Sequence, residues 1–414
     1  MAEILDRILS KYAAQGNDTK DKLLGAAFVV VSKDGILYQG AAGRIGSPTD
    51  SPPFAPDSFT WVASLTKIIT TTCLMQVVER GLISLDDDVR PLVPELARMQ
   101  ILRGFGADDG QPILEDNKKA ITLRHLLTHT VGLAYDIVDS DLVRWSHAVG
   151  RTVNNLSYTL GGWNTPLKFA PGEGWCYGSA VDWAGKVLEK LTGQGLEAYM
   201  AENIFGLLGI NDTTFHSTTA AVEASRVVPC SIRDAASGTV WPCELPVPAD
   251  PPVESGGAGL WTTAIDHARV LQALLFASSS TGDEADQAGR VLGKKTVDEM
   301  FRPQLDAVQR TRLKELTDMF HDGMVPEFPV GFGPIDHGIS GIINMEDVPG
   351  KRKKGSMMWA GMCNSHWWID RETGIGATLI VNVLPHPDLV VNRLYDELEA
   401  AVYGELIPVW AKKN

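Results

Sequence analysis

The sequence predicts an α+β protein in which both ends of the chain build one antiparallel sheet and a mostly helical lobe lies between them. Strand patterns occur near the N-terminus and again near the C-terminus, and the long middle of the chain is mainly helical in pattern. This order, strands then helices then strands, favours α+β over alternating βαβ units. We expect one domain over residues 1–414, with a sheet lobe from about 1–60 and 290–414 and a helical lobe from about 61–289.

The first elements are an amphipathic helix and a hairpin. Apolar residues recur at helical spacing in the opening segment "MAEILDRILSKYAAQ". Two strand patterns follow in "AAFVVVSKDGILYQGAAG", and Asp34-Gly35 between them is a strong hairpin signal. A proline-rich loop over residues 47–56 then leads into the middle of the chain.

The middle begins with a long apolar helix pattern that ends at Gly81. From residue 85 to 208 the pattern stays mostly helical, with a break at Gly193 and Gly195, and another helix is predicted over residues 266–276. In the tail, "HWWID" and "IGATLIVNVL" predict two strands joined by a turn at residues 371–374. The last predicted element is a helix from about residue 387 to 406.

Composition excludes several classes of function. The chain has 414 residues, a formal charge of −14 and an isoelectric point near 5.1, which argues against binding nucleic acid or an anionic membrane. Its one compact basic run, residues 351–354, is interpreted as a solvated loop. No stretch approaches the roughly 20 apolar residues of a membrane span.

The cellular location expected from the sequence is cytoplasmic. Glu3 and Asp6 interrupt the segment where a signal peptide would have its apolar core. The chain has five cysteines, an odd number without the spacing of a disulfide framework. Cys230 and Cys243 flank a predicted hairpin and could face each other, but free thiols fit a reducing compartment better.

The segment "WVASLTKIITTTCLMQVVERG" carries the first chemical signal, Ser64 and Lys67. Residues three apart share a helix face, so the hydroxyl and the amine come within hydrogen-bond reach. A serine at a helix N-terminus beside a lysine removed from water is an arrangement for an activated nucleophile. The alternative is a helix-capping serine and a solvated lysine, but the apolar neighbours leave little polar surface for Lys67.

Two later segments supply partners for this pair. In "PGEGWCYGSAVDWAG", Tyr177 and Ser179 come just before a predicted helix. In "KKGSMMWAGMCNSHWWID", Trp359 and Gly361 are predicted to open a strand, and Met362 could offer a backbone N–H.

Taken together, the three motifs resemble the serine β-lactamase/penicillin-binding protein superfamily, nearest to class C β-lactamases and family VIII esterases. S-x-x-K is the nucleophile signature of related enzymes. Segments such as "ITLRHLLTHTVGL", "NIFGLLGINDTTF" and "GGAGLWTTAIDHARVLQALL" also resemble the family, over roughly residues 20–400. The region "GIINMEDVPGKRKKGSMMWAGMCNSHWWID" and the acidic insertion at residues 108–116 resemble the fungal acyltransferases of the lovastatin side-chain type. The fold implied is β-lactamase/transpeptidase-like.

The resemblance also implies roles for individual residues. Ser64 is the nucleophile, Lys67 and Tyr177 share the acid–base work, and the N–H groups of Ser64 and Met362 form the oxyanion hole. A substrate-contacting role is implied for Ser179, Trp359, Ala360 and Gly361. Tyr135 also resembles a substrate-contacting position, and a packing role is the alternative for it.

Two departures from the penicillin-recognising branch affect the expected substrate. Ser179 stands where that branch has asparagine, and Trp359-Ala360-Gly361 stands where it has Lys-Thr-Gly or a close variant. Without that lysine no cation is available to hold a β-lactam carboxylate, so an uncharged, bulkier acyl substrate fits better.

Metal and nucleotide sites have weaker signals. His125 and His129 are four residues apart, as a metal pair would be, but no acidic third ligand is evident and two core histidines fit better. His366 is interpreted as a strand residue. The glycines at 256–259 lack both the G-x-G-x-x-G pattern and a preceding βα unit. No metal and no cofactor are therefore expected.

The function expected is a serine esterase that cleaves a small-molecule carboxylic ester through an acyl-Ser64 intermediate, such as the side-chain ester of a polyketide of the statin type. The alternative is acyl transfer to a polyketide alcohol from a thioester or an acyl carrier. A β-lactamase or a catalytically silent binding protein fits less well. Met362 stands where a family glycine would admit a fused ring, and this favours hydrolysis over transfer.

Overall fold

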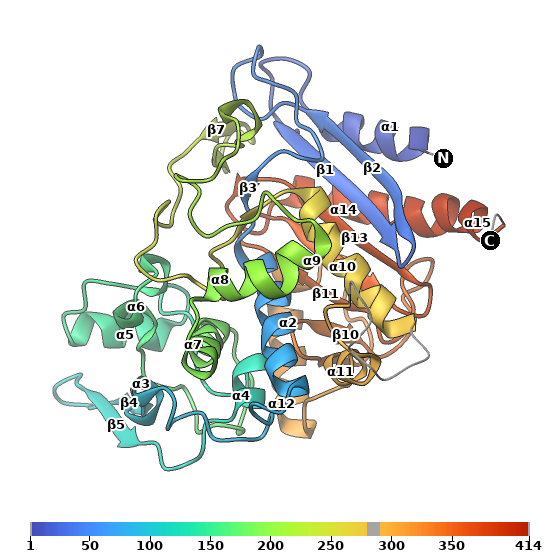
Figure 1. Ribbon diagram of the computed structural model, residues 1–414. Coiled ribbons are helices and arrows are strands. Elements are labelled where there is room, and N and C mark those ends of the chain that lie inside the picture. The colour runs from blue at the N-terminus through green and yellow to red at the C-terminus, as the bar shows by residue number, and fades with distance from the viewer. Residues whose placement is uncertain (1, 280–289, 413–414) are drawn as a thin grey trace.

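The computed structural model describes residues 2–279 and 290–412 and is built around a seven-stranded antiparallel sheet (Figure 1). The strands follow the order β2-β1-β13-β12-β11-β10-β9, so segments from both ends of the chain lie side by side within the sheet. Their bounds are β1 Gly25–Ser32, β2 Gly35–Gly43, β9 Ile335–His337, β10 Ile342–Asn344, β11 Met357–Ala360, β12 His366–Asp370 and β13 Ile375–Ile380. The fold class predicted from the sequence is confirmed.

The N-terminal hairpin and the C-terminal strands meet between β1 and β13. The Asp34-Gly35 turn joins β1 to β2 as predicted, and β1 pairs with β13 from Ala27 opposite Ile380 to Ser32 opposite Ile375. All eight residues of β1 and all six of β13 are buried. Their continuous apolar sequences fit strands that are covered on both faces.

Helices cover the sheet. Helix α10 (Ala264–Ser279) contacts β1 and β13, and Gly376 lets it approach closely, since a Cβ there would lie 3.2 Å from the Leu271 Cβ. Helix α1 (Ala2–Tyr12) contacts β2 and also α14 (Leu389–Ala401), where the Tyr12 hydroxyl donates to Glu397 at 2.8 Å. The α14 helix continues through a π-helical turn, η5 (Val402–Leu406), into α15 (Ile407–Trp410).

The middle of the chain supplies the remaining helices. Helix α2 (Thr66–Glu79) is buried from Thr66 to Val77 and contacts α7 (Ala180–Thr192) and α8 (Leu196–Met200). The other helical segments are α3 Pro94–Ala97, α4 Leu123–Leu127, α5 Ser140–Ala148, η2 Asn155–Ser157, α6 Leu160–Trp163, η3 Ala201–Phe205, α9 Gly206–Leu208, η4 Ala224–Arg226, α11 Lys294–Met300, α12 Ala307–Met319 and α13 His321–Met324. Among the described residues, no helix has the length and apolar character needed to cross a membrane.

Within the described part of the chain, three small sheets complete the fold. They are β3 (Thr60–Trp61) with β8 (Trp261–Thr262), β4 (Gln100–Phe105) with β5 (Pro112–Asp116), and β14 (Val383–Leu384) with β6 (Ser231–Arg233) and β7 (Val240–Pro242). The β4–β5 hairpin corrects the expectation of a mostly helical segment there. Leu102 N donates to Leu167 O at 2.8 Å, so a partner 65 residues further along the chain holds β4 extended.

Ser64 lies at the start of the helix as expected, in a 3₁₀ turn, η1 (Ala63–Leu65), that runs directly into α2. Two other local expectations are wrong. Trp359 and Gly361 lie at the end of a strand instead of at its start, because β11 ends at Ala360. Arg352 is not part of a solvated loop, since its side chain is fully buried between Glu399 and Glu327.

Candidate active site

Ser64 is held at the junction between β3 and α2. Val62 N donates to Leu260 O at 3.1 Å, and Ala63 adopts a left-handed backbone with φ of 45°. A residue other than glycine in that region is strained, and such strain is common at functional sites. Ser64 is 7% exposed. Its Oγ accepts hydrogen bonds from the Lys67 amine at 3.0 Å and the Tyr177 hydroxyl at 2.7 Å.

Lys67 is the second residue of α2 and is 1% exposed. Besides Ser64, its amine donates to the Gly257 carbonyl at 2.7 Å and to the Tyr135 hydroxyl at 3.5 Å. It also lies 4.7 Å from the centre of the Tyr177 ring, within cation–π range. Each of these partners is uncharged.

Tyr177 precedes α7 and receives a hydrogen bond from the opposite side of the site. The Trp359 indole N–H donates to the Tyr177 hydroxyl at 3.0 Å, and the two ring centroids are 4.8 Å apart. The Tyr177 oxygen thus accepts one hydrogen bond and donates another to Ser64. A fixed donor at this oxygen stabilises negative charge on it.

The end of β11 lies against the serine turn. A Cβ at Gly361 would lie 2.6 Å from Val62 O and 3.2 Å from a Leu65 methyl, so only glycine permits this approach. Ala360 and Met362, on either side of Gly361, are half-buried. This contact brings the backbone after β11 next to the turn that carries Ser64.

The remaining predicted contact residues differ in their surroundings. Tyr135 packs edge-on against Tyr177 with centroids 5.2 Å apart, and burial raises the pKa of its hydroxyl well above the ordinary value. Ser179 is the residue before α7 and is 1% exposed. Its hydroxyl has no hydrogen-bond partner among the described residues, so it is not joined to the Ser64 cluster by a bond.

The two histidines considered as a metal pair do not act together. His125 lies on α4 and caps it, its Nδ1 accepting from the Thr122 N–H at 3.2 Å. His129 has a left-handed backbone with φ of 59° and stacks edge-on against Tyr177. Burial lowers the pKa of His129 well below its ordinary value, so this ring is neutral. His366 lies on β12.

A family model described as Beta-lactamase matches residues 5–401. The chain belongs to the beta-lactamase family. The resemblance seen in the three sequence motifs is thereby confirmed for the family.

Two curated members of the beta-lactamase family show how close the likeness is. Lovastatin esterase from Penicillium rubens is 33% identical over 377 residues, which cover 88% of this chain and 90% of the esterase. Monacolin J acid methylbutanoyltransferase from Aspergillus terreus is 34% identical over 364 residues, 86% of this chain and 84% of the transferase. Among solved structures, unliganded simvastatin synthase from Aspergillus terreus superposes with a TM-score of 0.84 at 28% identity, over 98% of this chain and 99% of the synthase.

Sequence reasoning missed two groups at the site of this beta-lactamase family member. The Gly257 carbonyl bonded to Lys67 comes from the segment "ESGGAGLWTTA", which was considered for family resemblance and for a nucleotide motif but not as part of the active site. Asp182 is fully enclosed five residues after Tyr177 and accepts from the Gly257 N–H at 3.1 Å. The available signal was an aspartate in the first turn of a helix pattern with apolar neighbours.

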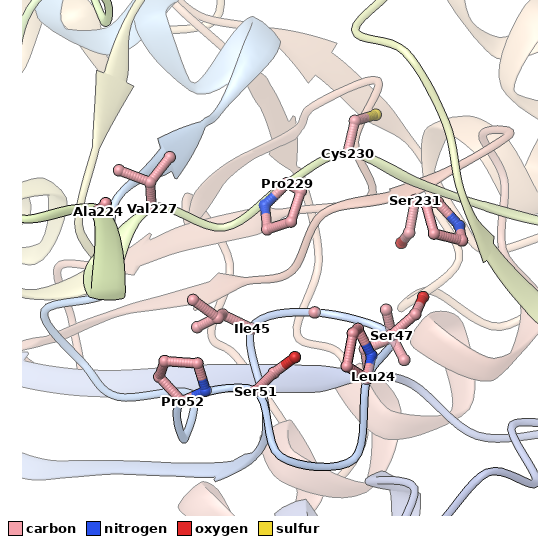
Figure 2. A pocket seen from close by; sticks show the side chains of 13 residues that line it. Leu24, Ile45, Ser47, Ser51, Pro52, Ala224, Val227, Pro229, Cys230 and Ser231 are labelled. Carbon is pink, nitrogen blue, oxygen red and sulfur yellow. The ribbon is translucent and has the colours of Figure 1, made fainter.

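A cavity of about 310 Å³ lies elsewhere, between the loop after β2 and the segment before β6 (Figure 2). Its wall is mostly apolar and includes Leu24, Ile45, Pro52, Val227, Pro229 and Cys230. None of Ser64, Lys67 and Tyr177 lines this cavity. The candidate active site is therefore located by the chemistry of its side chains and not by the cavity. Cys230 and Cys243 do face each other there, with sulfur atoms 3.3 Å apart.

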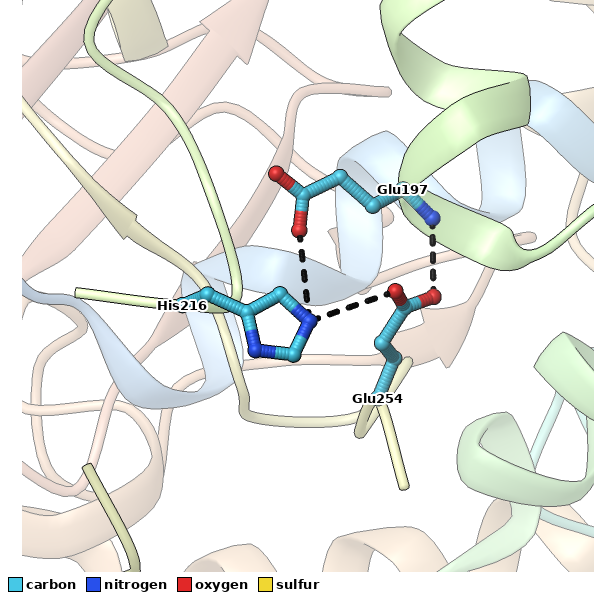
Figure 3. Close-up of side chains that lie close together, drawn as sticks. All are labelled: Glu197, His216 and Glu254. Carbon is cyan, nitrogen blue, oxygen red and sulfur yellow. Dashed lines mark hydrogen bonds and ion pairs between the residues drawn. The ribbon is translucent and has the colours of Figure 1, made fainter. Parts of the chain in front are cut away.

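Glu197, His216 and Glu254 form a separate cluster (Figure 3). One carboxylate oxygen of each glutamate and one ring nitrogen of the histidine lie within 4.8 Å of one another. His216 Nε2 is 3.5 Å from Glu254 Oε1. The Glu197 N–H donates to the other Glu254 oxygen at 2.9 Å. These contacts tie the loop that carries Glu254 to the start of α8.

Proposed function

We propose that this protein is a serine esterase that hydrolyses a small-molecule carboxylic ester through an acyl-Ser64 intermediate. The observation that carries the proposal is the double hydrogen bond to Ser64 Oγ, from Lys67 at 3.0 Å and Tyr177 at 2.7 Å, in a nearly buried site. A nucleophile within reach of two groups that can take its proton is the arrangement expected for covalent catalysis.

Acylation begins when Ser64 Oγ attacks the ester carbonyl carbon. The hydroxyl proton passes to the base formed by Lys67 and Tyr177, and the carbonyl oxygen becomes an oxyanion. When the tetrahedral intermediate collapses, the bond to the alcohol oxygen breaks and Tyr177 delivers a proton to that oxygen. The alcohol leaves and the acyl group remains on Ser64.

The oxyanion hole is assigned to the backbone N–H groups of Ser64 and Met362. Its support is the close packing of Gly361 on Val62, which brings the backbone after β11 to the serine turn. Preorganised donors at the developing charge typically contribute the largest single share of catalysis in acyl transfer.

Deacylation reverses these roles. Tyr177 takes a proton from a water molecule, the water oxygen attacks the acyl carbon, and the Ser64 oxygen leaves and is reprotonated. The residues named for this cycle supply all its proton transfers, so it requires neither a metal nor a cofactor.

The substrate class we propose is an ester between an acyl side chain and a polyketide alcohol of the statin type. Two curated relatives carry names for such chemistry, lovastatin esterase and monacolin J acid methylbutanoyltransferase. The residues proposed to contact the substrate are Tyr135, Ser179, Trp359, Ala360 and Gly361. With Trp359 in place of a lysine, β-lactam hydrolysis should be weak or absent.

Transfer of the acyl group to an alcohol is the second candidate, favoured by the 34% identity to the methylbutanoyltransferase. Its donor would be an acyl thioester or an acyl carrier. Met362 narrows the acceptor side, and we therefore favour hydrolysis. With an acyl thioester and a polyketide alcohol at millimolar concentration, free acid should exceed new ester. Dominant ester formation would make transfer the physiological reaction.

The decisive test is mass spectrometry with a slow ester. The wild type should carry one acyl adduct on the peptide that contains Ser64, and Ser64→Ala should lose both adduct and turnover while its melting temperature stays close to that of the wild type. An adduct on another peptide, or turnover by Ser64→Ala, would refute the assignment of Ser64 as the nucleophile.

We further propose that the chain forms a single catalytic domain and that it acts in the cytoplasm, where its thiols remain reduced.

A further inference from the structure

The loop that receives the Lys67 amine is fixed along one side of α2. Thr70 Oγ1 donates to Gly256 O at 2.8 Å, Lys67 Nζ donates to Gly257 O at 2.7 Å, and the Leu260 N–H donates to Thr66 Oγ1 at 3.1 Å. These three α2 side chains are buried. The Gly257 carbonyl therefore has a set position in front of the lysine.

The other side of this loop is fixed by Asp182. One oxygen of its carboxylate accepts from the Ser255 hydroxyl at 2.5 Å and from the Gly257 N–H at 3.1 Å. A Cβ at Gly257 would lie 2.7 Å from the other carboxylate oxygen, so the carboxylate packs directly on the glycine backbone. Glu254, the residue before Ser255, accepts a hydrogen bond from the first turn of α8 and lies close to His216 (Figure 3).

Gly257 thus stands between a buried carboxylate and a buried amine. Its N–H donates to Asp182 and its carbonyl accepts from Lys67. Burial raises the pKa of Asp182, whereas the Ser255 hydroxyl and the positive charge of Lys67 oppose that rise. Both donors converge on one oxygen, an arrangement that suits the ionised carboxylate.

We propose that Asp182 is a positioning residue for Lys67, acting through Gly257 and supplying the negative charge that compensates the lysine while it carries a proton. This inference rests on the proposed function. When Ser64 attacks, its proton moves to the Lys67–Tyr177 base. The positive charge that this creates on Lys67 is separated from the Asp182 carboxylate only by the Gly257 backbone. Direct contact is avoided, so the amine stays free to release the proton.

A pH profile can reveal this role because, apart from Tyr177 of the acid–base pair itself, the neighbouring groups do not change their charge around pH 7. The other titratable groups that face the pair are Tyr135, Tyr177, Tyr158 and His129. Burial raises the pKa values of Tyr135 and Tyr158 and lowers that of His129. These three side chains therefore keep their neutral forms around pH 7.

The experiment measures two rates as functions of pH in the full-length protein: labelling of Ser64 by a fluorophosphonate and hydrolysis of p-nitrophenyl acetate. Asp182→Asn keeps the acceptor oxygen and removes the charge. We expect its plateau rate to fall roughly tenfold or more, and its acid limb to move about one pH unit lower, because Lys67 loses its anion. Ser255→Ala, the matched control, loses a hydrogen bond but keeps the charge, so its acid limb should stay in place.

An acid limb of Asp182→Asn that coincides with that of the wild type would overturn the inference, whatever happens to the plateau. If Asp182→Asn does not fold, as judged by circular dichroism, Asp182→Ser provides the same neutral test. The proposed function fails separately, if the wild type shows no labelling at Ser64. Labelling at Ser64 with an unmoved limb in Asp182→Asn would overturn the role of Asp182 alone.

Discussion

Lys67 and Arg352 are two buried basic side chains with opposite surroundings. Lys67 is 1% exposed and its amine bonds only uncharged partners, the Ser64 and Tyr135 hydroxyls and the Gly257 carbonyl, in the contacts that the structure describes. Arg352 is fully buried, and its guanidinium lies 2.7 Å from Glu399 and 3.4 Å from Glu327.

The difference separates a basic group that can exchange a proton from one that cannot. The two carboxyls outweigh the effect of burial and hold the pKa of Arg352 well above its ordinary value, so this cation is permanent. An amine held by hydroxyls and a carbonyl has no directly bonded anion to lock its proton in place. The direct ion pairs of Arg352 therefore indicate a structural role, and the neutral hydrogen bonds of Lys67 indicate a catalytic one.

The largest effect should follow from replacing the lysine. Lys67→Met keeps the length and apolar stem of the side chain but removes the base. We expect kcat/KM for a p-nitrophenyl ester to fall by roughly 10² to 10⁴, the usual scale of general acid–base catalysis. The melting temperature should fall less than after removal of Arg352, because Asp182, which loses a compensating charge, faces Lys67 only through Gly257. Near-normal turnover by Lys67→Met would refute its role and remove the basis of the comparison.

Arg352→Met should do the reverse. Removing one partner of a buried ion pair leaves the other uncompensated, which typically costs about 3–5 kcal/mol of unfolding free energy. Denaturant unfolding should show this loss, while kcat of the folded fraction stays within a few-fold of the wild type. The matched control is Arg312→Met, whose exposed pair with Glu315 on α12 should contribute under about 1 kcal/mol. Equal losses in the two variants would contradict the assignment.

The same contrast explains what could be predicted from the sequence. Ser64 and Lys67 lie one turn apart, so local helix geometry predicts their contact. Tyr177 was found because it belongs to a motif that follows the S-x-x-K segment at family spacing. The Asp34-Gly35 hairpin and the strands on either side of residues 371–374 were likewise predictable from short-range signals.

The errors arose where distant segments decide. Arg352 lies in the basic run "KRKK", and distant partners bury it: Glu399, 47 residues later, and Glu327, 25 residues earlier. β4 is extended because Leu167 pairs with it. Asp182 and Gly257 meet across 75 residues of sequence, and no local pattern encodes that contact.

Glu327 gives a smaller, pH-dependent test of the buried ion cluster. Burial raises the pKa of Glu327 to about 7, although the Arg352 charge opposes this, whereas an unfolded glutamate titrates near pH 4.3. Because the folded pKa is the higher one, the stability it contributes is present below about pH 4 and is lost as the pH rises to about 7. Glu327→Gln does not titrate, so the wild type should lose a few kcal/mol relative to it between these pH values. Parallel stability curves from denaturant unfolding would show that folding does not raise the pKa of Glu327.

The smallest predicted effect concerns the neutral donor at Tyr177. Trp359→Phe keeps most of the ring that packs against Tyr177 but removes the indole N–H that donates to the Tyr177 hydroxyl at 3.0 Å. A hydrogen bond of this kind contributes about 1 kcal/mol, so kcat should fall by roughly five- to tenfold, with KM for a small ester little changed. The matched control is Trp175→Phe, since the buried Trp175 indole N–H has no hydrogen-bond partner among the described residues. Both variants lose the same atoms from the same aromatic cluster, and only the first removes a donor from the acid–base pair. If the two lose kcat equally, Trp359 acts by packing, and the neutral hydrogen bonds around Ser64 would then end at Tyr177 instead of extending to β11.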